Sequence, residues 1–416
     1  DSGFRKTEER ATFEACMKQI YKDLDSAIQL LPPSFGDLSS QTDLPKQFTD
    51  DELGEYNRVF GNNGRQRMSG LIAMAIRAKA SLLAASPAYQ SPDNTTSWED
   101  AANYAGEVLK LNGGVSGLAV NGETWYSNAS VMNNIAGGSN PPEVLWRGDI
   151  NSNTDLEKQN FPPTLFGQGR INPSENLVDA FPMQNGYPIN DPKSNYNPDD
   201  PYSGRVPLFS KYIVVNGSTE GPQSSIINTA SDGTTNDALN RVSTSTRTGY
   251  YMRKLLRMDV SVDPALTNSQ LHYIPRIRYT EIYLDYAEAA NEAWGPTGTG
   301  SFGFSAYDVI ASIRKREGID QPDEYLESVK GDKTAMRELI RNTRRIELCF
   351  EDFRFWDLRR WNEDLTDPAI GDKISGGKHN TFSVEDRKYK DYMRFGPIPK
   401  EEVLKFPTLI QNYGWN

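Results

Sequence analysis

The stretch Tyr279-Thr-Glu-Ile-Tyr-Leu-Asp-Tyr-Ala-Glu-Ala-Ala-Asn-Glu-Ala-Trp294 predicts a long helix. Its apolar residues recur at helical spacing, and Gly295-Pro296 ends the pattern. A second helical segment runs from Ser305 to Glu317, with Ser305 and Asp308 spaced as a capping box and Gly318 as the stop. We therefore predict a hairpin of two helices.

A similar hairpin is predicted earlier in the chain. A helix from about Ser69 to Ser86 carries small residues on one face, which lets a neighbouring helix approach closely. After Pro87, the stretch Ser97-Trp-Glu-Asp100 resembles a capping box and starts a helix that ends near Gly113. The two hairpins form a degenerate internal repeat with units of roughly 30–40 residues, as in tetratricopeptide-like helix pairs.

Further helices are predicted for Thr7 to Leu31, which Pro32-Pro33 stops, and for Thr334 to about Asn362. Residues 34–67 are polar and predict a connecting loop.

Between the helical halves, residues 112–268 are rich in Asn, Gly, Ser, Thr, Pro and Tyr. Short strands are plausible for Glu143 to Asp149 and Leu208 to Val215. The predicted fold class is mainly α, a tetratricopeptide-like helical-hairpin scaffold with a long loop-rich insertion containing short strands. We divide the chain into a first scaffold part (1–111), a ligand-binding insertion (112–268) and a second scaffold part (269–416) whose C-terminal tail packs back.

Composition excludes several classes of protein. The formal net charge of -11 opposes a nucleic-acid partner, and no stretch is apolar over the roughly 20 residues of a spanning helix. The two cysteines, Cys16 and Cys349, lie far apart and predict core residues rather than a disulfide framework or a zinc site. Because the chain begins with Asp1 and lacks an apolar leader, we expect it to be mature, trimmed or without an N-terminal part.

No catalytic constellation is visible, and we predict no catalytic residue, no metal and no cofactor. The two histidines, His272 and His379, are widely separated, and no Gly-x-Ser-x-Gly elbow occurs. The glycines from Gly298 to Gly303 follow a helix and predict a turn rather than a dinucleotide site. The alternating oxygens from Asp149 to Asp155 suggest calcium but lack the turn glycine and glutamate of the known loop, so a solvated loop is preferred.

Opposite charges recur three and four apart between Arg344 and Trp361, among large aromatic residues. We predict a structural network in which arginines pair with carboxylates while Phe355 and Trp356 enter the core.

Several segments together resemble the SusD/RagB family, surface lipoproteins of Bacteroidota that capture glycans. The resemblance is ordered along essentially the whole chain, with Tyr413 where proline is common. It rests on the segments Ile20–Ile28, Ala78–Tyr89, Glu175–Gly186, Gly249–Lys254, Tyr279–Ala289, Ile313–Gly318, Arg344–Trp361, Pro397–Glu402 and Gln411–Trp415.

The resemblance implies non-catalytic glycan binding at the extracellular face of the outer membrane and delivery to a SusC-like TonB-dependent transporter. It also implies a lipid anchor as the only membrane attachment. Family members usually carry 100 or more residues before the position of Asp1, including the lipid-anchored cysteine, which is absent from this chain. Cys16 cannot be that anchor, because it lies in a charged amphipathic helix.

Exposed aromatic rings stack on the apolar faces of sugars, while amides and guanidinium groups bind hydroxyls. Trp146 and Trp294 are expected in the core, so the candidates come from the loops of the insertion. The predicted ligand-binding residues are Trp125, Tyr126, Tyr187, Tyr196, Tyr202, Asn133, Asn134 and Arg170.

Three alternatives remain open: a helical-repeat scaffold that binds only proteins, a peptide-binding member of the same family, and a glycoside hydrolase with two loop carboxylates. The sequence does not discriminate among glycans, nor does it give an oligomeric state.

Overall fold

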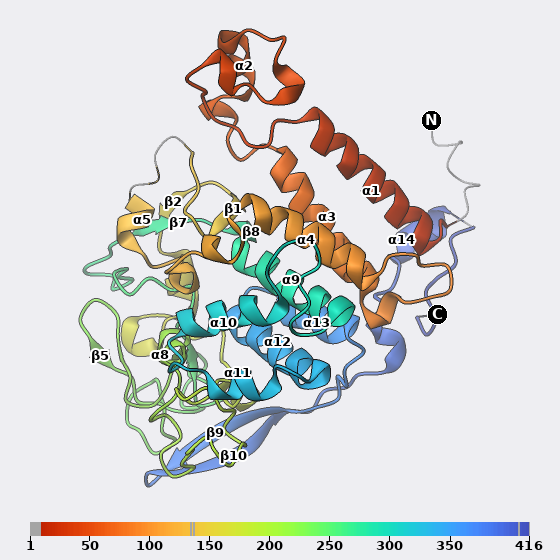
Figure 1. Ribbon diagram of the computed structural model, residues 1–416. Coiled ribbons are helices and arrows are strands. Elements are labelled where there is room, and N and C mark those ends of the chain that lie inside the picture. The colour runs from red at the N-terminus through yellow and green to blue at the C-terminus, as the bar shows by residue number, and fades with distance from the viewer. Residues whose placement is uncertain (1–9, 134, 136–137, 407, 416) are drawn as a thin grey trace.

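The computed structural model describes residues 10–133, 135, 138–406 and 408–415, which form a mainly helical protein (Figure 1). The helices are α1 (Phe13–Leu30), α2 (Leu53–Phe60), α3 (Gly70–Ala85), α4 (Trp98–Leu111), α5 (Ala129–Asn133), α6 (Asp155–Asn160), α7 (Glu175–Val178), α8 (Pro207–Tyr212), α9 (Tyr279–Trp294), α10 (Ala306–Glu317), α11 (Glu324–Val329), α12 (Lys333–Glu347), α13 (Phe353–Arg360) and α14 (Lys400–Lys405). None of them combines the length and apolar composition that crossing a bilayer requires.

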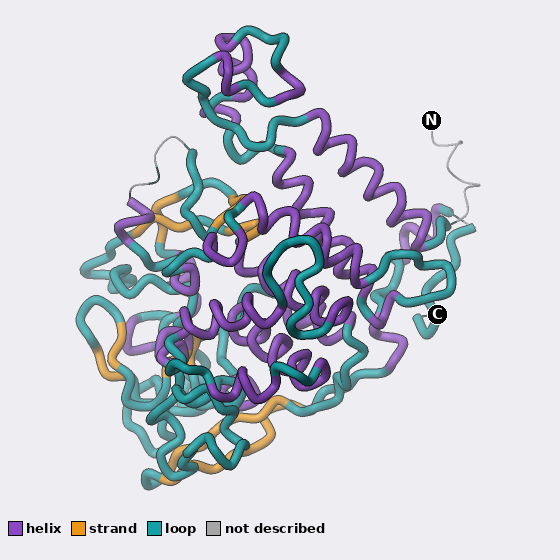
Figure 2. The backbone as a smooth tube through the Cα atoms, viewed as in Figure 1, coloured by secondary structure: helices purple, strands orange, loops and turns teal. Residues whose placement is uncertain are grey.

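The strands of the described residues form two-stranded sheets. Loops occupy much of the space between these sheets (Figure 2). The antiparallel pairs are β1 (Val144–Arg147) with β8 (Pro275–Arg278), β2 (Asn151–Asn153) with β7 (Gln270–His272), β3 (Ile213–Val214) with β6 (Tyr251–Met252), β4 (Thr219–Glu220) with β5 (Ser225–Ile226), and β9 (Ala369–Ser375) with β10 (Lys378–Glu385). The predicted fold class, a mainly helical scaffold with short strands, is confirmed.

Helix α9 lies at the centre of the scaffold and packs against α3, α4, α10 and α12. Helices α1, α3, α4 and α9 follow one another side by side (Figure 1). Ala287 and Ala290 of α9 and Ala102 and Ala105 of α4 are essentially inaccessible to solvent. Their small side chains let the helix axes approach closely, so one apolar core joins the two predicted scaffold parts.

The predicted helix ends are confirmed where a capping side chain specifies them. Ser97 with Asp100 and Ser305 with Asp308 each form a complete capping box at the start of α4 and α10. Gly318 ends α10 in the left-handed conformation, at a φ of 95° that favours glycine.

Three local predictions were wrong. Residues 207–212 form helix α8 rather than a strand, because Pro207 fits the first helical turn and has no N–H for a strand ladder; only Ile213 and Val214 pair with β6. The loop predicted for residues 34–67 contains helix α2. Cys16 is exposed on α1, whereas Cys349 is buried as predicted.

A buried ion cluster, the α13 cluster, joins α9, α12 and α13. Arg344 donates from Nε to Asp357 at 2.9 Å and from Nη1 to Asp285 at 2.6 Å. Arg360 donates to the same Asp357 at 2.9 Å and to both carboxylate oxygens of Glu288. Burial opposes ionisation of Glu288, yet the Arg360 guanidinium holds the pKa of that carboxyl below its usual value. The predicted pairing of arginines with carboxylates is therefore confirmed.

Replacing Arg360 tests how strongly this cluster holds the scaffold together. Arg360→Leu leaves Glu288 buried without its cation, so we expect the free energy of unfolding to fall by about 3–5 kcal/mol. Arg359→Leu is the matched control, because Arg359 lies on the same helix but faces the exposed Phe355 ring. Its expected cost is below about 1 kcal/mol. Urea denaturation of both variants measures the difference, and equal losses would contradict this role.

Candidate functional site

A cleft of about 660 Å³ is lined by residues from both the 112–268 and the 269–416 stretches of the chain. Its walls come from strands β2, β7 and β8, from helix α6 and from the turn between α12 and α13. The lining residues are Trp125, Tyr126, Met132, Asp149, Asn151, Asn153, Asp155, Leu156, Gln159, Leu255, His272, Tyr273, Ile274, Pro275, Arg276, Arg278, Glu281, Phe350, Glu351, Asp352 and Phe353. Both parts of the chain therefore contribute to the site.

One wall carries a row of oxygen-bearing side chains. Asp149, Asn151, Asn153 and Asp155 all line the cleft, and the middle of this stretch is strand β2. Alternate residues of a strand point to the same face, so the spacing that suggested a calcium loop places these four side chains along one wall. Within the described ranges, no three His, Cys, Asp or Glu side chains converge to hold a metal ion.

Trp125 and Tyr273 form the aromatic floor of the cleft. Their ring centroids are 5.2 Å apart, and the Tyr273 hydroxyl donates to the Trp125 carbonyl at 3.3 Å. Both side chains are largely buried by packing against the insertion core. The Trp125 indole N–H is also buried and has no acceptor among the described residues, so an oxygen supplied by water or ligand would satisfy it.

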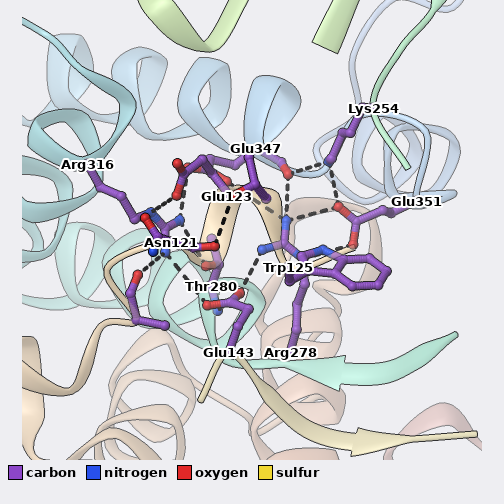
Figure 3. Close-up of polar contacts among 12 residues, drawn as sticks. Asn121, Glu123, Trp125, Glu143, Lys254, Arg278, Thr280, Arg316, Glu347 and Glu351 are labelled. Carbon is purple, nitrogen blue, oxygen red and sulfur yellow. Dashed lines mark hydrogen bonds and ion pairs between the residues drawn. The ribbon is translucent and has the colours of Figure 1, made fainter. Parts of the chain in front are cut away.

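Behind the floor lies a second buried ion cluster, the Arg278 cluster (Figure 3). Arg278 donates from Nη1 to Glu143 at 2.8 Å and from Nε and Nη2 to the two oxygens of Glu351 at 2.8 and 2.9 Å. Lys254 donates from Nζ to Glu351 at 2.6 Å and to the Glu347 carbonyl at 2.7 Å. Burial opposes ionisation of Glu351, but Arg278 and Lys254 together hold its pKa below the usual value.

Arg316 extends this cluster to helix α10 (Figure 3). Its Nη2 donates to Glu347 at 2.9 Å and to the Thr280 hydroxyl at 3.0 Å, and its Nη1 lies 3.6 Å from Glu143. Burial opposes the charge, while Glu347 and Glu143 raise the pKa of Arg316. Since Glu143 and Lys254 belong to the insertion, the cluster fixes the insertion to the scaffold.

The cleft continues into a hollow of about 600 Å³ beside α13. The two share Phe350, Asp352 and Phe353. The hollow is also lined by Phe355 and Trp356, whose residues are 53% and 60% exposed. The cleft and the hollow therefore adjoin at these shared residues, and we call the two together the groove.

The prediction that Phe355 and Trp356 enter the core was wrong. Asp357 and Arg360 are three apart on α13, and both turn inward to the α13 cluster. Phe355 and Trp356 therefore fall on the outer face of the helix. The buried charges therefore determine which face of α13 points into the protein. The spacing of residues along the helix does not by itself decide this.

Three of the predicted ligand-binding rings are buried, so the expectation that they are exposed was wrong. Trp125 and Tyr126 line the cleft but are only 7% and 6% accessible. Tyr187, 5% accessible, packs edge-on against Tyr325 of α11. These rings fix the loops of the insertion to the scaffold, where burial of their apolar area is favourable.

The remaining candidates among the described residues do not line the cleft. Tyr196 is half-buried, with the Arg205 guanidinium 5.8 Å from its ring. Arg170 is exposed and donates from Nε to Gln168 at 3.0 Å. Asn133 is exposed at the end of α5, and Asn134 lies outside the described residues.

Tyr202 belongs to a buried acidic network beneath the β9–β10 hairpin. Its hydroxyl donates to Asp372 at 3.2 Å, and His379 Nδ1 lies 2.6 Å from the same carboxylate. The Tyr250 hydroxyl donates to Glu175, whose pKa is raised to about 8, chiefly by burial. Through Asp372 of β9 and His379 of β10, the network holds Tyr202 against the hairpin.

The remaining sequence candidates are only partly buried. Trp146 and Trp294, both predicted in the core, are half-buried, and the Trp146 indole N–H donates to the Gln66 carbonyl at 2.9 Å. His272 lines the cleft from β7, and its Nε2 lies 2.9 Å from the buried Glu157 carboxylate. Burial opposes the charge, but Glu157 raises the pKa of His272.

Comparison with known proteins gives a consistent family likeness. A model of the SusD family matches residues 142–415. A SusD-like protein of Formosa agariphila, called P25, is 28% identical over 166 residues. That match covers 40% of this chain and 28% of the length of P25.

Solved structures show the same fold. A SusD-like protein from Bacteroides fragilis superposes with a TM-score of 0.69 at 22% identity, covering 98% of this chain and 72% of that one. A SusD-like carbohydrate-binding protein from the same species gives a TM-score of 0.67 at 20% identity, covering 97% and 72%.

Glu175 makes the stability of this protein depend on pH. Because its pKa is raised from 4.5 to about 8 on folding, the stability that it contributes is complete below about pH 4.5 and is lost as the pH rises to 8. The expected loss is at most about 1.4 kcal/mol per pH unit. Glu175→Gln cannot ionise, so its free energy of unfolding should fall less between pH 5 and pH 8 than that of the unaltered protein.

Urea denaturation at pH 5, 6.5 and 8 measures this difference. Glu385→Gln, an exposed position on β10, is the control and should keep the pH dependence of the unaltered protein. Identical pH profiles for Glu175→Gln and the unaltered protein would contradict a buried, protonated Glu175.

Proposed function

This chain belongs to the SusD family, and we propose on that basis that it captures glycans and releases them unaltered to a transporter. The SusD family consists of non-catalytic binding proteins, so this chain is not an enzyme. We further propose that it lies at the extracellular face of the outer membrane, held by a lipid anchor. Its proposed partner is a SusC-like TonB-dependent transporter.

The groove beside α13 is the proposed glycan site. The observation that carries this proposal is the exposed Trp356 in a hollow that adjoins a cleft whose walls bear amide and carboxylate oxygens. An indole face packs against the C–H face of a sugar ring, and the side chains of Asn151 and Gln159 can bind the hydroxyls at the rim. Sugar binding needs an accessible ring face and hydrogen-bonding side chains close to each other.

The expected affinity is weak. Burying about 50 Å² of apolar surface on each ring gives roughly 1 kcal/mol. Two or three such contacts with hydrogen bonds, less the cost of ordering the ligand, correspond to dissociation constants of about millimolar to micromolar. Weak, reversible binding suits a protein that hands its ligand to a transporter.

The binding role of Trp356 can be tested without disturbing the fold. Trp356→Ala should weaken binding to the preferred polysaccharide by about five- to thirtyfold, because about 1–2 kcal/mol of stacking is lost. Its melting temperature should stay unchanged, since the ring is 60% exposed. Trp125 is unsuitable for this test, because removing a buried Trp costs about 3–5 kcal/mol of stability.

Affinity electrophoresis and calorimetry with amylopectin, glucomannan, arabinoxylan, polygalacturonate and alginate measure the effect. Tyr413→Ala is the control, an aromatic residue that is 90% exposed and lines neither the cleft nor the hollow. Unchanged affinity in Trp356→Ala would remove the groove as the site. Release of reducing ends would contradict the function itself, and binding of oligopeptides alone would favour the peptide-binding alternative.

The delivery step has a separate test. If the protein supplies a transporter, we expect the gene for a TonB-dependent transporter beside its own, and the two proteins should purify together from solubilised outer membranes. A chain that remains alone in such a preparation would contradict the proposed partner while leaving glycan binding intact.

A further inference from the structure

We infer that the cleft selects uncharged or amine-bearing saccharides and discriminates against acidic ones. The inference rests on the proposed function and adds the substrate class to it. Some of the carboxylates that line the cleft are paired with a cation, and others are exposed to an incoming ligand. The inference depends on this difference.

Two of the lining carboxylates are neutralised from behind. Glu351 is paired with Arg278 at 2.8 Å and with Lys254 at 2.6 Å. Glu281 is 2% exposed and lies 2.6 Å from the Lys79 ammonium group. Because each of these carboxylates is paired with a cation, the two contribute little negative electrostatic potential at the mouth of the cleft.

Three other lining carboxylates, the rim aspartates Asp149, Asp155 and Asp352, are exposed and form no ion pair with any described residue. Arg276 is the exposed cation among the lining residues, all of which lie in the described ranges. Its guanidinium lies over the Trp146 ring, 4.6 Å from the centroid. The buried Arg147 guanidinium interacts electrostatically with Asp149, whose charge opposes the lowering of the Arg147 pKa by burial. Three carboxylates against Arg276 and Arg147 leave the rim with a net charge of about -1.

The hollow differs from the cleft, because the exposed Arg354 lines the hollow alone, and the carboxylates that act on its guanidinium are Asp357 and Glu363. Asp149, Asp155 and Asp352 therefore outnumber Arg276 and Arg147, so the excess of negative charge belongs to the cleft end of the groove. His272 adds little, since its ring is held by Glu157. The formal net charge of -11 for the whole chain acts in the same direction at longer range.

Hydrogen-bond chemistry leads to the same selection. Ionised carboxylates only accept, so the rim aspartates can bind sugar hydroxyls or amines, which donate, but not ionised sulfate or carboxylate groups, which also only accept. The Trp125 indole N–H, buried on the floor without an acceptor, complements them, because a hydroxyl oxygen can accept from it. One neutral sugar can therefore serve both walls.

The experiment compares each neutral polysaccharide that binds with its own carboxymethylated derivative. Both are measured in 1 mM EDTA at 20 mM and at 500 mM NaCl. At low salt, the carboxymethylated form should bind about three- to tenfold more weakly, and the difference should shrink at high salt because exposed charges are then screened.

The triple variant Asp149→Asn, Asp155→Asn, Asp352→Asn should bring the ratio of the two affinities close to one at low salt. The matched control is Asp199→Asn, Asp200→Asn, Asp367→Asn. It changes the net charge equally at exposed positions that line neither the cleft nor the hollow, and should retain the ratio of the unaltered protein.

Each outcome decides the matter. The inference would be overturned if the rim variant kept the affinity ratio of the unaltered protein, or if both triple variants brought the ratio equally close to one. Either result would leave glycan binding intact. Binding of polygalacturonate or alginate in preference to every neutral polysaccharide would also overturn the inference. If no polysaccharide binds, the proposed function fails and the inference fails with it.

Discussion

Arg278 is buried and connects three segments of the chain that lie far apart in sequence. One guanidinium holds Glu143 of the insertion, Glu351 of the turn after α12 and the carbonyl of Glu347. A buried charge is tolerated only when its hydrogen bonds are satisfied, so these segments have little freedom to separate. The loop-rich insertion is therefore ordered by ion pairs to the scaffold as well as by its own apolar clusters.

The same contacts position the candidate site. Arg278 and Glu351 lie at the back of the cleft, and the chain continues directly from Glu351 to Asp352 at its mouth. The α13 cluster then sets the rotation of the next helix through Asp357. Burying charge on one face of α13 leaves Trp356 on the other, so the fold supplies an exposed ring in the hollow.

Binding residues were harder to predict than helices, for a specific reason. A ring in a polar loop, such as Tyr187, can pack against the scaffold or face solvent, and local sequence does not distinguish the two. The row from Asp149 to Asp155 was noticed for its alternation, but the same spacing fits an ion-binding loop and one face of a strand. Only pairing of β2 with β7 decided between them.

Sequence alone was enough to predict the helical hairpins, the capping boxes at Ser97 and Ser305 and the likeness to the SusD family, because these depend on residues near one another along the chain. Tertiary structure alone decided which aromatic rings are accessible and which carboxylates remain unpaired. Accessibility and charge pairing both depend on residues that are far apart in sequence and meet only in the folded chain, as Arg278 and Glu143 do. The energy of a buried ion pair depends on the geometry of that contact.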